Sequence, residues 1–337
     1  MLSSGMKILF IGGTGNISTD CAALLRKRGH EISVVTRGKS RVRLAYDSIV
    51  ADRKNLGAMQ KALEGVTADV VINFLGYEMA DVETDYALFA GKVSQYIFIS
   101  TAMVYAKPHL QIPIAEQSPL GNPYSPYARN KLQCEQWLLE RHATDKFPVT
   151  IVRPSHTYSK RWIPNTVSSP GYWLGTRFEQ GKPMFVANDG ENPWTLTATS
   201  DFAVGLAGLV GNEKAVGESF HITSDEALSW NQIYTEIAAA VGNASPVIEK
   251  IPLDFLCERF PETIEFTKGD KAEPGVFDNS KIKRFVPDFK CKKPFAVGIR
   301  ESVAWLGAHP EDQHPNPQAD ALVDAIIAAW REKKPAG

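Results

Sequence analysis

Residues 7–18 read KILFIGGTGNIS. Their first five positions form a short apolar run of the kind that is buried in a parallel sheet, and glycines follow at once. From Cys21 to Arg28 the apolar positions recur at helical spacing, and residues 31–36 predict a second strand. This order of strand, glycine turn, helix and strand is typical of a βαβ unit of about 30 residues.

We interpret the glycine turn as a dinucleotide-binding site, with a plain tight turn as the alternative. Gly12 permits the turn, and Gly15 lets the backbone approach a pyrophosphate, whose charge is favoured at the start of the helix. Ser18 stands where a third glycine is usual, and its volume predicts slightly wider packing of helix against strand. Three neighbours are expected to line the same site: Thr14, Asn16 and Ile17.

The composition is that of a folded chain with a small-molecule function. With 44% hydrophobic and 22% charged residues, the chain has enough apolar surface to build a core, which excludes a disordered or fibrous protein. The 37 Lys and Arg residues against 38 Asp and Glu leave a formal net charge of -1, so charge gives no case for a nucleic-acid partner. The length of 337 residues predicts roughly two domains.

The four cysteines stand at long spacings without a C-x-x-C pair or a histidine cluster, so we expect neither a metal site nor a disulfide scaffold. The start of the chain, Met1 to Gly5, lacks the charged region of a secretory signal. No run approaches the ~18 consecutive apolar residues of a membrane-spanning helix. We therefore expect a cytoplasmic protein with no membrane partner.

Four further strands are predicted in alternation with helices, at residues 48–51, 70–75, 96–100 and 149–153. This pattern predicts an α/β fold built on a Rossmann-type, doubly wound parallel sheet. In such a sheet the ligand lies across the carboxyl ends of the strands, so the residues just after each strand are the candidates for a binding site.

Six motifs carry a family resemblance. In chain order they are GGTG at 12–15, ADR at 51–53, FLG at 74–76, STAMVY at 100–105, SPYARNK at 125–131 and RP at 153–154. In this order they resemble the extended short-chain dehydrogenase/reductases and, more narrowly, their NAD-dependent epimerase/dehydratase branch. The resemblance covers residues 7 to about 230.

The candidate catalytic residues are Thr101, Tyr127 and Lys131. Tyr127 and Lys131 lie four residues apart and share one face of a helix. A tyrosine with a pKa of about 10 is a poor base at neutral pH, but an adjacent ammonium and a positive nicotinamide ring favour its phenolate. The resemblance places the Thr101 hydroxyl beside the same substrate oxygen. An exposed tyrosine and lysine on a surface helix is the alternative.

The two residues after Thr101 bear on the reaction. Family members that eliminate water resemble Thr-Asp-Glu at this position, where the acid protonates the leaving hydroxyl. This chain has Ala102 and Met103, which carry no proton, so dehydration is disfavoured and epimerisation or simple oxidation and reduction remains. We expect Met103 to face the substrate.

The choice between NAD and NADP, bound once per chain, stays open. Where an acidic residue would bind the adenosine ribose, the chain has Arg37, followed by Lys39 and Arg41, and these cations favour a 2'-phosphate. The epimerase resemblance favours NAD, and Arg37 as a solvated loop cation is a further alternative. Asp52 resembles the family's adenine-binding aspartate, or it caps the next helix. The remaining expected cofactor contacts are Arg53, Phe74, Leu75, Gly76 and Pro154.

The second half is expected to bind the substrate. The resemblance places His156 near the reacting sugar, with a structural histidine as the alternative. Arg161 and Trp162 combine a cation with an aromatic plane and predict contacts to a phosphate and a ring, with an ordinary loop composition as the alternative. Asp201 and Ser229 are predicted N-caps of helices. An alanine-rich helix over residues 319–330 is expected to pack on the body rather than on a partner.

We therefore expect residues 1–154, with a returning segment near 200–225, to form a dinucleotide-binding domain, and residues 155–337 to form mainly a smaller α/β substrate lobe. The predicted function is an NAD(P)-dependent epimerase of a sugar, most simply a nucleotide sugar, with Tyr127 as acid and base. One alternative is an NADP-dependent carbonyl reductase. Another is a non-catalytic relative that senses nucleotides or binds RNA. The resemblance also implies a homodimer formed through helices that flank the active site.

Overall fold

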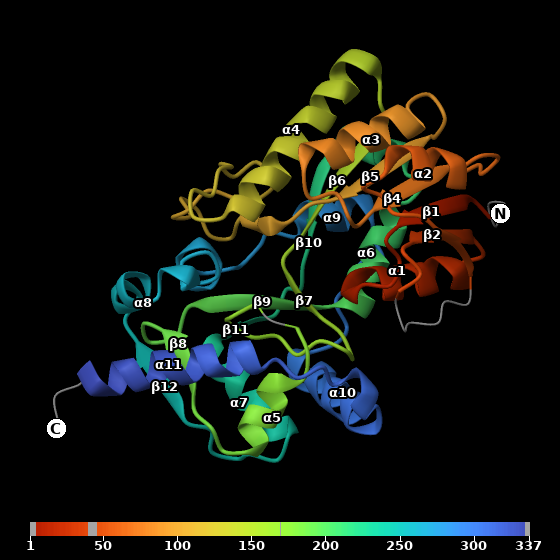
Figure 1. Cartoon of the computed structure of the whole chain (residues 1–337). Helices are drawn as coiled ribbons and strands as arrows, with labels where there is room; N and C mark the ends of the chain where they lie inside the picture. Colours follow the sequence, from red (N-terminus) through yellow and green to blue (C-terminus); the bar gives the residue numbers. More distant parts are fainter. Residues whose placement is uncertain (1–4, 40–45, 169, 334–337) are drawn as a thin grey trace.

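The computed structural model describes residues 5–39, 46–168 and 170–333 (Figure 1). Residues 1–4 and Arg41, which entered the sequence predictions, lie outside the described residues. The larger part of the fold is a seven-stranded sheet in the order β10-β6-β5-β4-β1-β2-β3, in which every neighbouring pair is parallel. The strands are β1 Lys7–Ile11, β2 Glu31–Thr36, β3 Asp47–Val50, β4 Val70–Asn73, β5 Gln95–Ile99, β6 Val149–Pro154 and β10 Ser219–Ile222.

Helices cover both faces of this sheet, which confirms the predicted doubly wound α/β fold. Successive side chains of β1 point to opposite faces, so Ile8 packs in one apolar cluster and Leu9 in the other. The first cluster is covered by α1 Asn16–Lys27, α6 Thr199–Leu209 and α9 Ser280–Phe285. The second is covered by α2 Leu56–Ala62, α3 Met79–Phe89 and α4 Pro126–Asp145.

The chain leaves the sheet after β6 and later returns to it through α6 and β10. Between and after these elements lie a three-stranded sheet, a two-stranded sheet and further helices. The strands are β7 His156–Tyr158, β8 Met184–Ala187, β9 Pro193–Ala198, β11 Ala227–Ser229 and β12 Ile248–Ile251, and the helices are α5 Trp173–Glu179, α7 Trp230–Ala240, α8 Leu253–Arg259, α10 Phe295–Ala308 and α11 Pro317–Lys333. These elements enclose a separate apolar core.

The starts of two helices show how well the local sequence predicts an N-cap residue. Ser229 caps α7 as predicted, because its hydroxyl accepts a hydrogen bond from the backbone N–H of Gln232 and the Gln232 side chain accepts one from the N–H of Ser229. The predicted cap at Asp201 is wrong, since α6 begins two residues earlier and its N-cap is Ala198. The Asp201 carboxylate instead accepts a hydrogen bond from the backbone of Lys293, a distant partner that the local pattern does not contain.

The C-terminal helix α11 packs on the body, as predicted. Its buried residues Val323, Ile326 and Ile327 join the core of the smaller part, against α5 and β8. No helix within the described residues is long and apolar enough to cross a membrane. The four cysteines, all among the described residues, are free, and the described residues hold no group of three acidic, His or Cys side chains that could bind a metal.

Candidate active site

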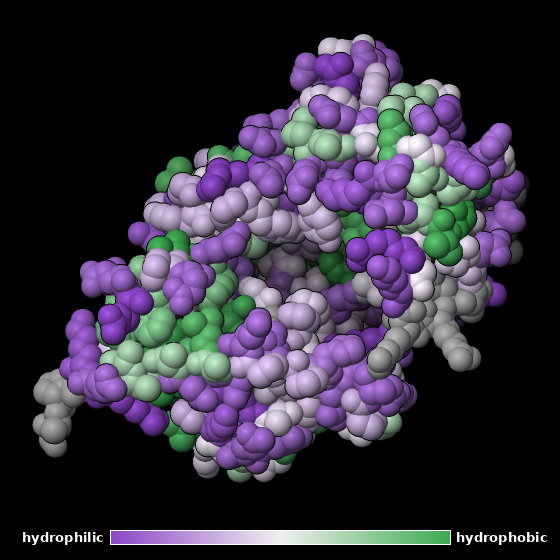
Figure 2. All heavy atoms as spheres, viewed as in Figure 1, coloured by the Kyte–Doolittle hydropathy of each residue, from purple (hydrophilic) through white to green (hydrophobic). Residues whose placement is uncertain are grey.

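A cavity of about 850 Å³ lies at the carboxyl ends of the parallel strands and faces the smaller part of the molecule. Figure 2 shows the hollow between the two parts. Segments that directly follow β1, β2, β3, β4, β5 and β6 all contribute to its lining. The predicted site residues that line it are Gly12, Thr14, Gly15, Asn16, Ile17, Arg37, Asp52, Arg53, Phe74, Leu75, Thr101, Met103, Tyr127, Lys131, Pro154, His156 and Trp162.

The structure does not bring Gly76 and Arg161 to this lining. Gly76 lies against the ring of Phe98, where an added Cβ would come within 2.6 Å of a ring carbon. Arg161 lies with its guanidinium 5.0 Å from the centre of the Trp305 ring and forms an ion pair with Asp312. Gly76 therefore has a packing role beneath the cavity, and the cation of Arg161 is engaged away from it.

The glycine turn is shaped by close contacts on both sides. Gly12 has a φ of +82°, and an added Cβ there would lie 2.5 Å from the side chain of Leu75. A Cβ on Gly13 would lie 2.5 Å from Val34, which is a constraint that the sequence alone did not reveal. Ser18 is buried and accepts a hydrogen bond of 2.9 Å from the N–H of Gly15, so its hydroxyl holds the turn against the helix.

The candidate catalytic side chains meet in the cavity. Thr101 lies just after the buried end of β5, and Tyr127 and Lys131 lie on the first turns of α4. Ser125 caps this helix through a hydrogen bond from the N–H of Ala128. The Lys131 ammonium donates to the carbonyl oxygen of Ile99 at 2.7 Å. The helix cap and this bond fix the lysine relative to the end of β5.

Burial has the largest effect on the pKa values of Tyr127 and Lys131. Burial lowers the pKa of Lys131 to about 8. It raises the pKa of Tyr127 well above its ordinary value, and hydrogen bonding from the Thr101 hydroxyl opposes this rise. Although 37% of Tyr127 is exposed, its hydroxyl end is closely surrounded by protein. In the protein alone, burial thus has the largest effect on the Tyr127 pKa, and the ammonium of Lys131 lies 5.9 Å from the centre of the Tyr127 ring.

The end of the cavity beside β2 and β3 carries cations. Arg37 and Lys39 follow β2 and line the cavity, together with Asp52 and Lys54. Asp52 does not cap the next helix, because Asn55 does so through the N–H of Ala58, while Asp52 accepts from the N–H of Lys54. The predicted position for a ribose phosphate is therefore lined by side chains of both signs.

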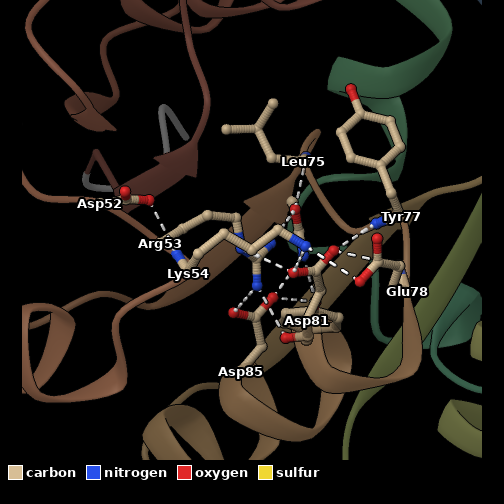
Figure 3. Close-up of polar contacts among 10 residues, drawn as sticks. Asp52, Arg53, Lys54, Leu75, Tyr77, Glu78, Asp81 and Asp85 are labelled. Atoms are coloured by element: carbon tan, nitrogen blue, oxygen red, sulfur yellow. Dashed lines mark hydrogen bonds and ion pairs between the residues drawn. The ribbon is translucent and has the colours of Figure 1, made fainter.

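Arg53 reaches the cavity lining but is held in a buried ionic cluster (Figure 3). Its guanidinium lies 2.9 Å from the carboxylate of Asp85 and 3.5 Å from that of Asp81. Asp85 also accepts hydrogen bonds from Asn73 and from the Tyr96 hydroxyl. Burial raises the pKa of Asp85 to about 6, although Arg53 opposes the rise. Arg53 thus has a structural partnership that the sequence did not predict.

The cavity lining also holds residues that the sequence did not single out. They are Tyr77, Lys107, His109, Ser168, Trp194, Asp270, Lys271 and Phe277. The ammonium of Lys107 lies 2.7 Å from Nε2 of His109, and that of Lys271 lies 2.6 Å from the carboxylate of Asp270. Burial lowers the pKa of His156 to about 3, with a further effect of Lys271, so its imidazole is neutral. These residues come from segments far apart in the sequence, and no local motif marks them.

The cavity fits a dinucleotide. Gly12 and Gly15 of the glycine turn line it, and Oδ1 of Asn16 and Oγ of Ser100, both buried in the lining, have no hydrogen-bond partner within the described residues. Such orphaned atoms are suited to contacts with the hydroxyls and phosphates of a bound nucleotide.

The chain belongs to the NAD dependent epimerase/dehydratase family, whose model matches residues 8–222. This places the protein in the class whose motifs the sequence resembled. Among solved structures, it is similar to the UDP-glucose 4-epimerase of Thermus thermophilus in complex with NAD. The TM-score is 0.73 at 18% identity, over 90% of this chain and all of the other, so this likeness concerns the fold.

Two further relatives of this chain are not named as epimerases. The chain is 25% identical to the 2'-dehydrokanamycin reductase of Streptomyces kanamyceticus over 305 residues, which are 89% of this chain and 84% of the relative. It is 29% identical to the chloroplast stem-loop binding protein of 41 kDa b of Arabidopsis thaliana over 261 residues, which are 73% of this chain and 66% of the relative. These three similar proteins are thus named for epimerisation, reduction and stem-loop binding.

Proposed function

We propose that the protein is an NAD(P)-dependent epimerase of a sugar or nucleotide sugar. The observation that carries the proposal is the meeting of Thr101, Tyr127 and Lys131 in one cavity with the glycine turn. Ala102 and Met103 stand where a dehydratase would need an acid, which leaves reversible oxidation at a hydroxyl-bearing carbon. The cytoplasmic location and the homodimer belong to the same proposal.

Each side chain has a defined task in this reaction. Tyr127 takes the proton from the substrate hydroxyl and returns it after the sugar has turned. Thr101 donates a hydrogen bond at the same oxygen, and the charge of Lys131 stabilises the tyrosine phenolate. A bound nicotinamide supplies the acceptance and return of hydride. Gly12, Gly15 and Asn16 are suited to hold its pyrophosphate.

The substrate side supports a sugar with an anionic group. Trp162, Trp194 and Phe277 give the cavity aromatic walls on which the apolar face of a sugar ring can lie. Lys107 and Lys271 add two ammonium groups on that side. Lys271 pairs with the carboxylate of Asp270 and Lys107 donates to its backbone carbonyl, so a phosphate would find cations there to contact. These contacts make a nucleotide sugar our preferred substrate class.

The test loads the purified protein with NAD⁺ or NADP⁺ and incubates it with UDP-glucose, UDP-N-acetylglucosamine and GDP-mannose in separate reactions. Proton NMR of the anomeric region follows epimer formation, while absorbance follows the reduced nicotinamide. We expect a new epimer without net accumulation of reduced cofactor. A protein that binds neither dinucleotide would contradict the proposal.

A carbonyl reductase is the second candidate, and the cations Arg37 and Lys39 favour it, since they suit the 2'-phosphate of NADP. The reductase relative agrees with this candidate. Net oxidation of NADPH in the presence of a keto sugar, without epimer formation, would select it. Cofactor binding with neither reaction would instead favour a non-catalytic role in nucleotide sensing or RNA binding.

A further inference from the structure

The ammonium of Lys131 is enclosed by aromatic rings. It lies 4.8 Å from the centre of the Tyr77 ring, 4.9 Å from that of Phe98 and 5.9 Å from that of Tyr127. The side chain is only 1% exposed, and its hydrogen bond to the carbonyl of Ile99 occupies one of the three N–H donors of the ammonium. A buried ammonium in such surroundings is stabilised by the negative faces of the rings around it.

Tyr77 differs from the other two rings in its position. Phe98 belongs to the buried sheet and Tyr127 is the candidate acid and base, whereas Tyr77 follows the FLG motif on the loop between β4 and α3. It lines the cavity, is 43% exposed, and its ring centre lies 6.4 Å from that of Tyr127. Tyr77 therefore covers Lys131 from the open side of the cavity and contacts both members of the pair.

The backbone of Tyr77 is anchored by the ionic cluster beneath it. The N–H groups of Tyr77 and Glu78 both donate to one oxygen of Asp81, at 2.8 and 3.1 Å. The other oxygen of Asp81 pairs with Lys54 at 2.9 Å and with Arg53 at 3.5 Å. Figure 3 shows this cluster on one side of the loop and the Tyr77 ring projecting to the other. The loop is thus tied down at the residue that carries the ring.

We propose that Tyr77 is a positioning residue for Lys131. Its ring face holds the ammonium in its charged form beside Tyr127, and the Asp81 anchor holds the ring in place. The importance of a charged Lys131 for turnover rests on the proposed function, whereas the contact between ring and ammonium does not.

The physical reason lies in the balance between burial and attraction. Burial disfavours the charged form of Lys131 and lowers its pKa to about 8. Among the groups that face it, Cys134, Glu135 and Asp81 oppose this fall in pKa and Arg53 adds to it, and all four stay unchanged when only the ring is removed. A ring face at this distance favours the charged form, and the effect is larger where water is excluded. Removing the ring while retaining an apolar side chain should therefore shift the titration of Lys131 to lower pH.

The test measures this titration directly and needs no substrate. The protein is labelled with ¹³C at the lysine ε position, the Lys131 resonance is assigned with a Lys131→Arg variant, and its shift is followed against pH. The variants are Tyr77→Leu, which removes the ring, and Tyr77→Phe, which keeps it. Tyr124→Leu is the matched control, because the Tyr124 ring lies 4.8 Å from the ammonium of a different lysine, Lys268.

We expect the wild type, Tyr77→Phe and Tyr124→Leu to titrate alike and Tyr77→Leu to titrate at lower pH. A Lys131 titration in Tyr77→Leu at or above the wild-type pH would overturn the proposal, because the Tyr77 ring would then not be what keeps the ammonium charged. Thermal unfolding of each variant checks that the fold is kept, which the partial exposure of Tyr77 favours. Failure of the epimerase assays leaves this result unaffected, so the two proposals can fail separately.

Discussion

Replacing Glu135 with glutamine should destabilise the protein by about 3–5 kcal/mol, because it removes one partner of a buried ion pair. Glu135 lies on α4, and its carboxylate pairs with the guanidinium of Arg153 on β6 at 2.6 Å, with two further contacts of 3.0 and 3.2 Å to Nε. Both side chains are almost fully buried. Since glutamine nearly matches the shape of glutamate, the variant isolates the loss of charge opposite Arg153.

The Glu135–Arg153 ion pair matters for the candidate active site because α4 also carries Tyr127 and Lys131. Urea unfolding followed by circular dichroism measures the effect: with a slope of about 3 kcal/mol per molar urea, the midpoint should fall by at least about 1 M. The matched control is Glu140→Gln on the same helix, whose partner Arg141 lies nearer the surface, with an expected loss of at most about 1 kcal/mol. Equal midpoints for the two variants would refute the reasoning. A double Glu135→Met and Arg153→Met variant should lose less stability than the single one, since no buried charge remains unpaired.

Three further predictions concern the cavity. Tyr127→Phe should keep its affinity for the cofactor, measured by fluorescence titration, and lose at least about 100-fold in turnover. Full activity of this variant would remove Tyr127 from the mechanism. Turnover should decline as pH rises above about 8, because Lys131 is charged below that pH and neutral above it; a flat profile from about pH 7 to about pH 9.5 would contradict a role for its charge. In calorimetry, Arg37→Asp should weaken NADP⁺ binding about 10-fold or more and leave NAD⁺ binding within about 2-fold of the wild type. Equal losses of affinity for both dinucleotides would show that Arg37 does not contact the 2'-phosphate.

Much of the larger sheet could be predicted because its central strands, β1, β4, β5 and β6, are buried on both faces. Such strands appear in the sequence as continuous apolar runs, and β1 begins and ends at the predicted residues, Lys7 and Ile11. Strand β4 ends at Asn73 rather than Leu75, since Asn73 bonds to Asp85 and to the N–H of Leu75 and turns the chain out of the sheet. The pattern of hydrophobicity does not contain these polar contacts.

The two halves of the cavity differ in how far the sequence defines them. Gly12, Thr101 and Tyr127 each lie at or near the end of a regular element, so the order of elements was enough to bring them together. Lys107 and Asp270 lie far apart in the chain, and the ammonium of Lys107 donates to the backbone carbonyl of Asp270 at 3.3 Å. Their contact depends on tertiary packing, which neither propensity nor spacing encodes.

Arg53 shows the same limit in a residue that the motifs singled out. Its place in the ADR segment predicted a cofactor contact, and it does line the cavity. Its guanidinium is nonetheless committed to Asp81 and Asp85 on α3, 28 and 32 residues further along the chain. A motif indicates where a residue stands, whereas its charge partners follow from the packing around it.

The most direct test of the proposed nicotinamide-dependent chemistry is mass spectrometry of the bound cofactor. The purified protein is incubated with equal amounts of NAD⁺ and NADP⁺, free nucleotide is removed, and the protein is denatured to release the small molecules for analysis. We predict close to one nicotinamide dinucleotide per chain, and its identity decides between NAD and NADP. A protein that releases neither dinucleotide would contradict the proposed chemistry, whatever the geometry of Thr101, Tyr127 and Lys131.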